Sequence, residues 1–326
     1  MRVLVCGSEG SLMQAVIPKL VGAGHKVSGV DNLMRYGRRF DHAKVDYEFH
    51  KLDLADNIST ESIMQTVEPD YVIQAAARIY GIGGFNKYCA DILGEDVSLH
   101  NNVLKSAVNC GVKRVAYISS SMVYENCVQS LEFPVTEDMP DHAQNPTTDY
   151  GLSKFVGERL SKAFARQYKL DYTIWRPFNI ITPYEKAESS DIGISHVFAD
   201  FIKKIIVEKS KNISIIGDGS QVRCFTWIHD VAQAIADYSF DPRTQNQCYN
   251  LGNDEPITMT ELAHMIHDVG VELKLIDDGN LTFTTVRHYH DDVRIRIPNV
   301  DKAQTQLNWK AKQKVRESIE QCLKQI

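Results

Sequence analysis

The chain has 326 residues, of which 43% are hydrophobic, and carries a net charge of −6, so it can bury a sizeable core and has no basic excess that would indicate nucleic-acid binding. It contains no apolar run of about 18 residues, the length that a membrane-spanning helix requires, and Met1-Arg2-Val3 leads into a predicted strand without a signal-peptide layout. Seven scattered cysteines are typical of free thiols in a reducing compartment. We therefore expect a cytoplasmic protein with neither a membrane nor a nucleic-acid partner.

The first predicted elements form a strand–turn–helix–strand unit. A buried strand, Arg2 to Cys6, is followed by a glycine-containing turn, a helical stretch, and a second strand that ends in Asp31. This order is the context of a dinucleotide-binding fingerprint. Gly7 and Gly10 let the backbone approach a pyrophosphate at the helix N-terminus, where unpaired N–H groups favour an anion. Asp31 is placed to hydrogen-bond the adenosine ribose. The alternative interpretation of the whole unit is a tight strand–helix turn that binds no ligand.

Further short apolar runs are predicted to be strands: residues 71–76, 115–119 and 171–176. They alternate with helical stretches, which is typical of an α/β fold with a doubly wound parallel sheet of the Rossmann type. Ligands bind such sheets outside the carboxyl ends of the strands. The predicted motifs fall at those ends, so we expect them to meet at one edge of the sheet.

The chain length predicts one large domain or two intimately joined ones. We expect residues 1–176 to form the dinucleotide-binding Rossmann domain and residues 177–326 to form mainly a smaller substrate-binding lobe. A segment near residues 213–240, at 213–216 or at Trp227, is expected to return to the Rossmann domain.

Tyr150 and Lys154 are the strongest candidates for chemistry. The stretch from Tyr150 to Leu170 has helical periodicity, and residues four apart lie on the same helix face. A cation beside a phenol favours the phenolate, so we expect Lys154 to lower the pKa of Tyr150. Such a pair suits the interconversion of a hydroxyl and a carbonyl group. Alone, this spacing is also common on solvated helix faces.

With Gly7, Gly10, Asp31, Ser120, Tyr150 and Lys154 in this order, the chain resembles the extended short-chain dehydrogenase/reductase superfamily. Within it, the chain resembles the nucleotide-sugar epimerase/dehydratase family over nearly its whole length. The most specific tail signatures are residues 217–223 and 225–231. The resemblance implies NAD as cofactor, no metal, a nucleotide sugar as substrate and a homodimer that pairs helices near residues 96–109 and 151–167.

The resemblance also implies site residues. The catalytic residues it implies are Ser120, Tyr150 and Lys154, with Tyr150 acting on a sugar hydroxyl at C4. The implied cofactor-binding residues are Gly7, Gly10, Ser11, Leu12, Asp31, Asn32, Asp53, Leu54, Ala75, Ala76, Ala77, Asn102, Tyr150, Lys154 and Pro177. The implied substrate-binding residues are Ser121, Met122, Asn179, His196, Val197, Arg223 and Arg294, with Arg296 an alternative to Arg294 as a clamp for phosphates or ribose.

Two departures from the family pattern bear on the reaction. Met13 stands where the family has a third glycine, so the first helix is expected to sit slightly displaced. Ser121 and Met122 stand where 4,6-dehydratases have an acidic pair, which disfavours dehydration and decarboxylation. The loop from Ala76 to Phe85 resembles that of GDP-mannose 3,5-epimerase and GDP-fucose synthase. Those enzymes use a cysteine at the position of Met122, and His196 aligns with its partner.

Several alternatives remain open at this level. Asp31 would repel a 2′-phosphate and favours NAD, although Arg35, Arg38 and Arg39 follow it. His196 is equally well explained as a surface or capping residue. His288, His290, Asp291 and Asp292 resemble metal ligands only superficially.

The leading hypothesis is an NAD-dependent epimerase or C4 oxidoreductase that acts on a GDP- or UDP-sugar. The second is a GDP-sugar 3,5-epimerase/4-keto reductase that uses His196. The third is a non-catalytic nucleotide-binding protein, which would have no need of Ser120, Tyr150 and Lys154.

Overall fold

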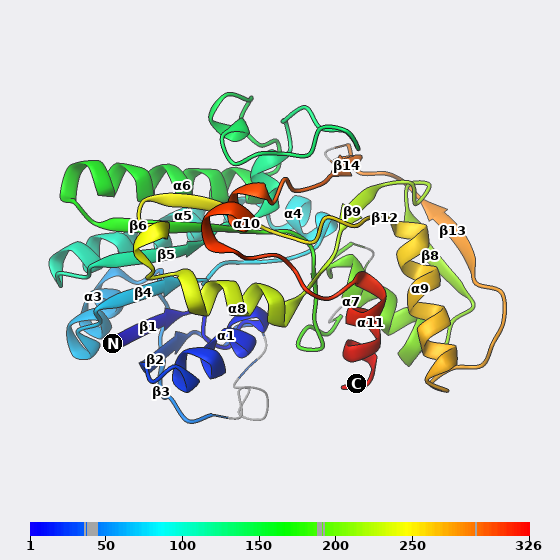
Figure 1. The fold of residues 1–326 in the computed structure, drawn as a ribbon, viewed down its shortest axis with the longest axis horizontal. Coiled ribbons are helices and arrows are strands. Elements are labelled where there is room, and N and C mark those ends of the chain that lie inside the picture. Colours follow the sequence, from blue (N-terminus) through cyan, green and yellow to red (C-terminus); the bar gives the residue numbers. More distant parts are fainter. Residues whose placement is uncertain (36, 38–44, 188–190, 192, 291) are drawn as a thin grey trace.

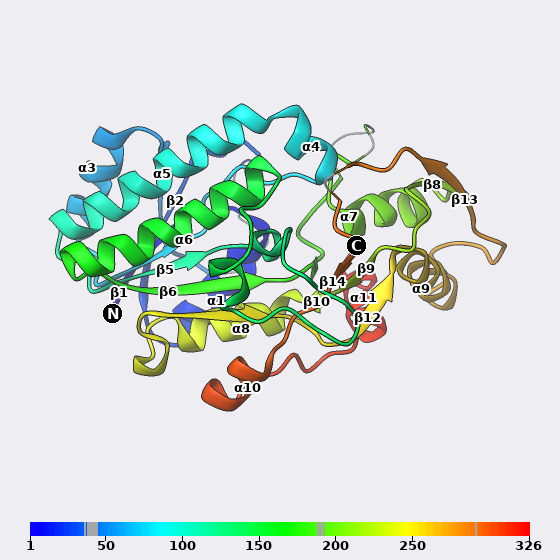
Figure 2. The same cartoon turned by 90° about the horizontal axis from the view of Figure 1, so that it is seen from above.

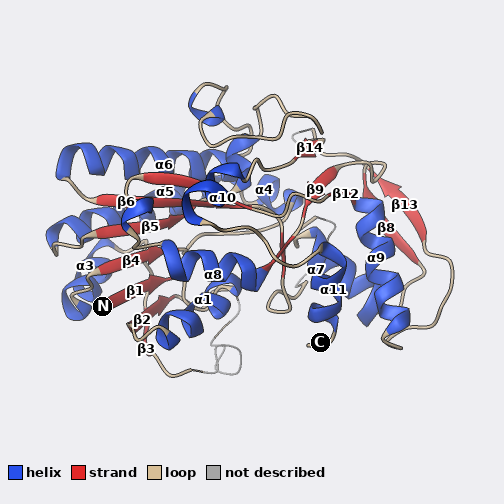
Figure 3. Cartoon of the chain, viewed as in Figure 1, coloured by secondary structure: helices blue, strands red, loops and turns tan. Residues whose placement is uncertain are grey.

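A seven-stranded parallel sheet forms the centre of the computed structural model, which describes residues 1–35, 37, 45–187, 191, 193–290 and 292–326 (Figure 1, Figure 3). The strands lie in the order β11-β6-β5-β4-β1-β2-β3. Their bounds are β1 Arg2–Cys6, β2 Lys26–Asp31, β3 Glu48–Lys51, β4 Tyr71–Gln74, β5 Arg114–Ile118, β6 Asp171–Pro177 and β11 Gln247–Leu251. The prediction of a doubly wound Rossmann-type sheet is confirmed.

Helices cover both faces of this sheet because successive strand side chains point to opposite sides. In β1, Val3 and Val5 pack with α1 (Ser11–Gly22) and α8 (Ile228–Tyr238), while Leu4 and Cys6 join the core on the other face. That second face is covered by α3, α5 and α6 (Figure 2). These helices span Asn57–Val67, Cys89–Asn109 and Asp149–Tyr168.

Met13 is accommodated within this packing. Its side chain is buried in the core between α1 and the sheet, so the helix keeps apolar contact where a glycine would leave space. The expected displacement of the helix stays a prediction.

The strand order reverses between β1 and β4, which are neighbours in the sheet but are separated in sequence by β2 and β3. Ligands of open α/β sheets bind outside the carboxyl ends of the strands at such a switch point. Gly7 follows β1 and Ala75 follows β4, so the glycine turn lies at this position.

The C-terminal lobe contains three small sheets that the sequence did not predict. They are β7-β10, β12-β9-β14 and β13-β8. Their strands are β7 Ile180–Ile181, β8 Asn212–Ile216, β9 Val222–Cys224, β10 Thr226–Trp227, β12 Pro256–Thr258, β13 Thr282–Val286 and β14 Ile295–Arg296. The remaining helices are α4 Ile82–Lys87, α7 Val197–Phe201, α9 Met259–Glu272, α10 Asp301–Leu307 and α11 Val315–Leu323, with single turns η1 Ser121–Tyr124, η2 Met139–Asp141, η3 Ile202–Val207 and η4 Pro242–Thr244.

The segment near residues 213–240, which was expected to return to the Rossmann domain, contributes a helix and no strand to the central sheet. Residues 213–216 lie in β8, which pairs with β13, and Trp227 lies in β10, which pairs with β7. The strand that joins the central sheet is β11, which pairs with β6. Within the predicted segment, α8 packs on the sheet beside α1.

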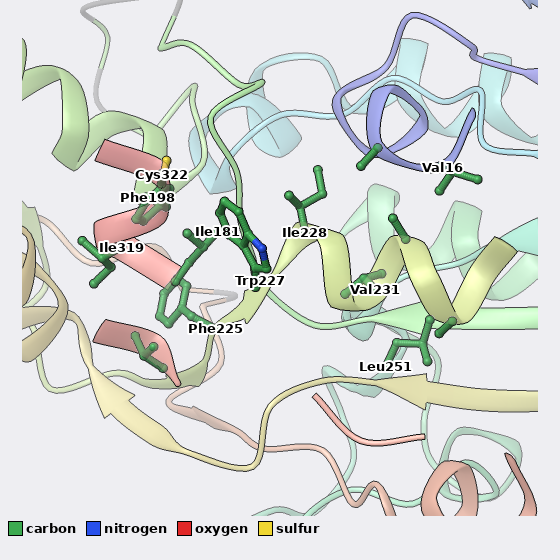
Figure 4. Close-up of a cluster of buried hydrophobic side chains, with 14 of the residues drawn as sticks. Val16, Ile181, Phe198, Phe225, Trp227, Ile228, Val231, Leu251, Ile319 and Cys322 are labelled. Atoms are coloured by element: carbon green, nitrogen blue, oxygen red, sulfur yellow. The ribbon is translucent and has the colours of Figure 1, made fainter. Parts of the chain in front are cut away.

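One apolar cluster ties the sheet to the lobe (Figure 4). Trp227 and Ile228 lie between Val16 of α1 and the C-terminal helix α11, which contributes Ile319 and Cys322. This continuity holds the two walls of the cavity described below in one arrangement. None of the described helices combines the length and apolar character needed to cross a membrane.

Candidate active site

A cavity of about 510 Å³ lies at the carboxyl edge of the central sheet, against the C-terminal lobe. Most of the predicted site residues meet in its wall. They include Gly7, Gly10, Ser11, Leu12, Asp31, Asn32, Asp53, Leu54, Ala75, Ala76, Ala77, Ser120, Ser121, Met122, Tyr150, Lys154, Pro177, Asn179, His196, Val197 and Arg223. Asn102 and Arg294 are absent from it.

The part of the cavity at the switch point, which we call the cofactor end, requires glycine at its centre. Gly7 has φ +75°, and a Cβ atom there would lie 2.7 Å from the backbone nitrogen of Ala76. Gly10 precedes the first turn of α1 and has no side chain with which to cap it. The unpaired N–H groups of that turn therefore face the cavity, where they suit a phosphate group.

Asp31 is held at the cofactor end by backbone hydrogen bonds. Its carboxylate accepts from the N–H groups of Leu33, at 2.7 Å, and Glu9, at 3.0 Å. Arg35, one of the possible 2′-phosphate ligands, instead donates to the carbonyl oxygen of Ile79 and pairs with Glu185. Arg38 and Arg39 lie outside the described residues.

Asn102 has a different place from the one predicted. Its side chain donates to the carbonyl oxygens of Leu54 and Ala55, at 3.1 and 3.0 Å, behind the wall of the cavity. It thus fixes the segment that carries Asp53 and Leu54, both of which line the cavity. The place of Asn102 on a predicted helix does not indicate whether its side-chain amide lies on the cavity side of the Asp53–Leu54 segment or behind it.

The catalytic centre consists of Ser120, Tyr150 and Lys154. Thr148 caps α6 by accepting from the N–H of Gly151, which sets Tyr150 in the first turn. The Tyr150 ring stacks on Phe85, with centroids 4.4 Å apart and planes 6° from parallel. Ser120 accepts from the N–H of Met122 at the start of η1 and lies close enough to the Tyr150 phenol to influence its pKa.

The expected effect of Lys154 on Tyr150 is wrong. Burial raises the pKa of Tyr150 well above its usual range, and the nearby Ser120 hydroxyl offsets this only in part. The cations that lower the Tyr150 pKa are Arg35 and Arg296. The Lys154 ammonium instead donates to the carbonyl oxygen of Ile118 at 3.2 Å and lies 5.7 Å from the Tyr150 ring centroid.

Asp96 of α5 is a buried acid beside this centre that the sequence reasoning missed. It accepts from the N–H of Arg78 at 2.8 Å and from the hydroxyl of Ser153 at 3.5 Å. Burial raises the pKa of Asp96 to about 6, against the opposing effect of Lys154. Burial likewise lowers the pKa of Lys154, and Asp96 counteracts that shift.

The part of the cavity next to Met122 and away from the cofactor end, which we call the distal end, contains two buried arginines. Arg223 binds Asp292, with Nη2 and Oδ1 2.8 Å apart. Arg296 places Nη1 2.8 Å from the sulfur of Met122, and burial lowers its pKa to about 9. Arg296, the alternative to Arg294 as a clamp, lines the cavity, whereas Arg294 is exposed and does not, so a role for Arg294 in binding stays a prediction.

His196 has a carboxylate partner in the cavity wall. Its Nδ1 atom lies 2.7 Å from Oε1 of Glu185, a residue that the sequence reasoning did not single out. Burial raises the pKa of Glu185, but the charge and hydrogen bond of His196 outweigh it and leave the pKa below its usual value. His196 is also the N-cap residue of α7, without a side-chain cap hydrogen bond, and 39% of its side chain is exposed, so the capping and the functional interpretations both stay predictions.

The structure offers no metal site among the described residues, where no group of three or more His, Cys, Asp or Glu side chains converges. Asp291, one of the superficial candidates, lies outside them. Asp292 instead pairs with Arg223. The seven cysteines, all of them described, are free thiols.

Comparison with known proteins gives consistent matches. The family model described as "NAD dependent epimerase/dehydratase family" matches residues 3–252. GDP-L-fucose synthase 1 of Arabidopsis thaliana is 27% identical, over 97% of this chain and 95% of that protein. UDP-glucuronate 4-epimerase of Thermodesulfobacterium geofontis is 27% identical, over 98% of this chain and 94% of that protein. The crystal structure of UDP-glucose 4-epimerase from Thermotoga maritima with UDP-glucose has the same fold, with a TM-score of 0.82, 24% identity and coverage of 100% and 98%.

Proposed function

Because the chain belongs to the NAD dependent epimerase/dehydratase family, we propose that it is a nucleotide-diphosphate-sugar epimerase or oxidoreductase that acts at the C4 hydroxyl of the sugar. The observation that carries this proposal is the convergence of Ser120 and Tyr150 in a cavity that continues to the Gly7 turn. A hydroxyl bound there would lie within reach of the phenol.

The cofactor end fits NAD. The Gly7 cradle and the open first turn of α1 suit the pyrophosphate, and Asp31 suits an unphosphorylated ribose. Lys154, buried beside Tyr150, suits the hydroxyls of the nicotinamide ribose. When bound, NAD accepts a hydride from a carbon that carries a hydroxyl group and can return it.

The chain's own residues move the proton. Ser120 and Tyr150 hold the C4 oxygen. The raised pKa keeps the phenol protonated, which is the state that donates to a carbonyl oxygen. Arg35 and Arg296 favour the phenolate that receives the proton in the opposite direction. Arg223 and Arg296 suit the substrate diphosphate, whose binding energy orients the sugar.

We expect hydride chemistry at C4 without exchange at C3 or C5. Met122 has no proton to give or take where a carbon acid would need a second acid–base group. The test incubates the NAD-loaded protein with GDP- and UDP-sugars in deuterium oxide and follows each carbon by NMR. Conversion at C4 without deuterium at C3 or C5 supports the proposal. Fast deuterium entry at C3 or C5 contradicts it.

A 3,5-epimerase/4-keto reductase is the second candidate, and the His196–Glu185 contact favours it. A carboxylate at one ring nitrogen fixes the orientation and the tautomer of a histidine. Under this alternative, His196→Ala abolishes exchange at C3 or C5 in the same NMR experiment. Under the C4 proposal, the variant changes substrate binding more than turnover.

Cofactor preference should depend on Asp31. We expect the protein to bind NAD more tightly than NADP, and Asp31→Ala to narrow the difference by about tenfold, the value of one charge-assisted hydrogen bond. Titration of both cofactors by calorimetry gives the two dissociation constants. Asp31→Asn is the control for the backbone contact with Leu33, since it keeps an acceptor. Tighter binding of NADP by the unaltered protein would overturn the expectation.

We propose a homodimer in which α5 and α6 pair with their copies across a two-fold axis. The two helices lie side by side on the outer face of the sheet, as an isologous four-helix interface requires (Figure 2). Light scattering at micromolar concentration is expected to give twice the chain mass of 36.9 kDa. A monomer alone contradicts the proposal.

A further inference from the structure

Asp200 in the cavity wall belongs to an acid–ammonium pair, with Lys204, that neither the catalytic centre nor the two arginines use. Asp200 lies in α7 and Lys204 one helical turn later in η3, with Nζ and Oδ2 2.6 Å apart. Both side chains are largely buried, with 18% and 16% of their surface exposed. The Lys204 ammonium also lies 3.4 Å from the carbonyl oxygen of Ser214, and Asp200 and Ser214 both line the cavity.

A chain of contacts leads from the catalytic centre to this pair. Arg296 touches Met122 and lies beside Arg223 in the register of β14 and β9. Arg223 binds Asp292, which also accepts from the side-chain amide of Gln221. That amide donates to the carbonyl oxygen of Ile216 in β8, two residues after Ser214. A nucleotide sugar with its sugar at Tyr150 and its diphosphate at the arginines would thus place its base near β8.

The pair is only partly shielded from water, and a ligand in the cavity would replace that water at its remaining hydrogen-bonding positions. Removing two charges from water is compensated only when the remaining lone pairs and protons are also satisfied. Burial raises the pKa of Asp200, against the opposing effect of Lys204. Within the described residues, Oδ2 of Asp200 binds Lys204, while Oδ1 accepts no hydrogen bond.

We propose that Asp200, held in place by Lys204, selects guanine as the base of the nucleotide-sugar substrate. Guanine presents two adjacent donors, N1–H and N2–H, followed by the O6 acceptor. A carboxylate accepts from two adjacent donors, which matches the N1–H and N2–H groups. Uracil flanks its single N–H with two carbonyls, which would face the carboxylate unfavourably. Adenine and cytosine present an unprotonated ring nitrogen beside their amino group, and this acceptor would also face the carboxylate unfavourably.

This inference rests on the proposed function for the order of sugar, diphosphate and base, but its test uses no sugar. The probes are GDP, IDP and UDP, titrated against the full-length NAD-loaded protein by calorimetry. IDP lacks only the 2-amino group, so it isolates one hydrogen bond to the carboxylate. The expected preference for GDP is about tenfold over IDP and about 100-fold over UDP, from the loss of one or more charge-assisted hydrogen bonds.

Asp200→Asn is the decisive variant. It keeps the size of the side chain and loses the second acceptor, so the GDP/IDP ratio should fall to near one while UDP affinity stays the same. Glu208→Gln is the matched control, because it removes an exposed carboxylate that follows η3 outside the cavity. It should preserve the preference for GDP.

Either of two results overturns the inference: UDP binding as tightly as GDP to the unaltered protein, or an unchanged GDP/IDP ratio in Asp200→Asn. Failure of the proposed C4 chemistry leaves this readout intact, because no nucleoside diphosphate undergoes the reaction. Conversely, a loss of guanine preference leaves the NMR test of C4 chemistry unaffected.

Discussion

Tyr150→Phe should slow turnover by about two to four orders of magnitude, the usual effect of losing a general acid–base. The substitution removes one oxygen atom from a ring that stacks on Phe85, and the ring packing is kept. Ser120 keeps its hydrogen bond from the N–H of Met122, so the start of η1 stays in place. NAD affinity and thermal stability should therefore change little. Steady-state kinetics with the nucleotide sugar identified by the NMR screen gives the turnover number.

Tyr117→Phe is the matched control for this experiment. Tyr117 is also buried, and its ring centroid lies 5.3 Å from the Lys154 ammonium, but it does not line the cavity. Loss of the Tyr117 hydroxyl should leave turnover nearly unchanged. Equal effects of the two substitutions would mean that packing around Lys154, and not proton transfer by Tyr150, limits the reaction.

The sequence predicted the parts of the site that have local patterns. The Gly7 turn follows an apolar strand and precedes a helix, so the chain order alone predicts both its conformation and its place at the sheet edge. Tyr150 and Lys154 follow from helical spacing in the same way. Asp96, Glu185 and Asp200 were missed because a single acid on a helix or loop has no local signature. Their burial becomes evident only when distant segments pack together.

Tertiary packing also decided details that the sequence left open or misplaced. Arg294 and Arg296 are two residues apart, and β14 is too short for a periodic pattern, so only its pairing with β9 identifies Arg296 as the buried one. The direction of the Tyr150 pKa shift also depends on tertiary packing that the sequence does not reveal. Helical spacing predicts a neighbouring cation, but the degree of burial, which dominates the shift, depends on Phe85 and the lobe.

Glu158→Gln should lower the free energy of unfolding by about 3–5 kcal/mol, the usual cost of breaking a fully buried ion pair. Glu158 lies on α6 and binds Arg176 of β6 through two contacts, Oε1–Nε at 2.8 Å and Oε2–Nη2 at 2.6 Å. Both side chains are fully buried. Glu158 also accepts from the hydroxyl of Ser119 at 2.6 Å. The pair therefore fastens the helix that carries Tyr150 to β6, and the contact with Ser119 fastens the same helix to the end of β5 that carries Ser120.

Chemical denaturation followed by circular dichroism, with NAD at a fixed concentration, measures this loss. Glu272→Gln is the control, because Glu272 forms an exposed pair with Arg316 at 2.6 Å and such pairs contribute at most about 1 kcal/mol. The two substitutions should differ in their effect on stability because each leaves an arginine without its carboxylate partner, one buried and one exposed. The neutral amide introduced by Glu158→Gln would leave the Arg176 guanidinium uncompensated in the core, whereas water solvates Arg316.

The double variant Glu158→Leu, Arg176→Met separates this cause from a loss of packing. Replacing a buried pair by apolar residues of similar volume removes the unpaired charge, so part of the stability lost in Glu158→Gln should return. The recovery is limited, because Arg176 also donates to the Tyr124 hydroxyl and to the carbonyl oxygen of Glu137, at 2.7 and 2.8 Å. A double variant no more stable than Glu158→Gln would show that these two hydrogen bonds, and not the charge balance with Glu158, hold α6 against the sheet.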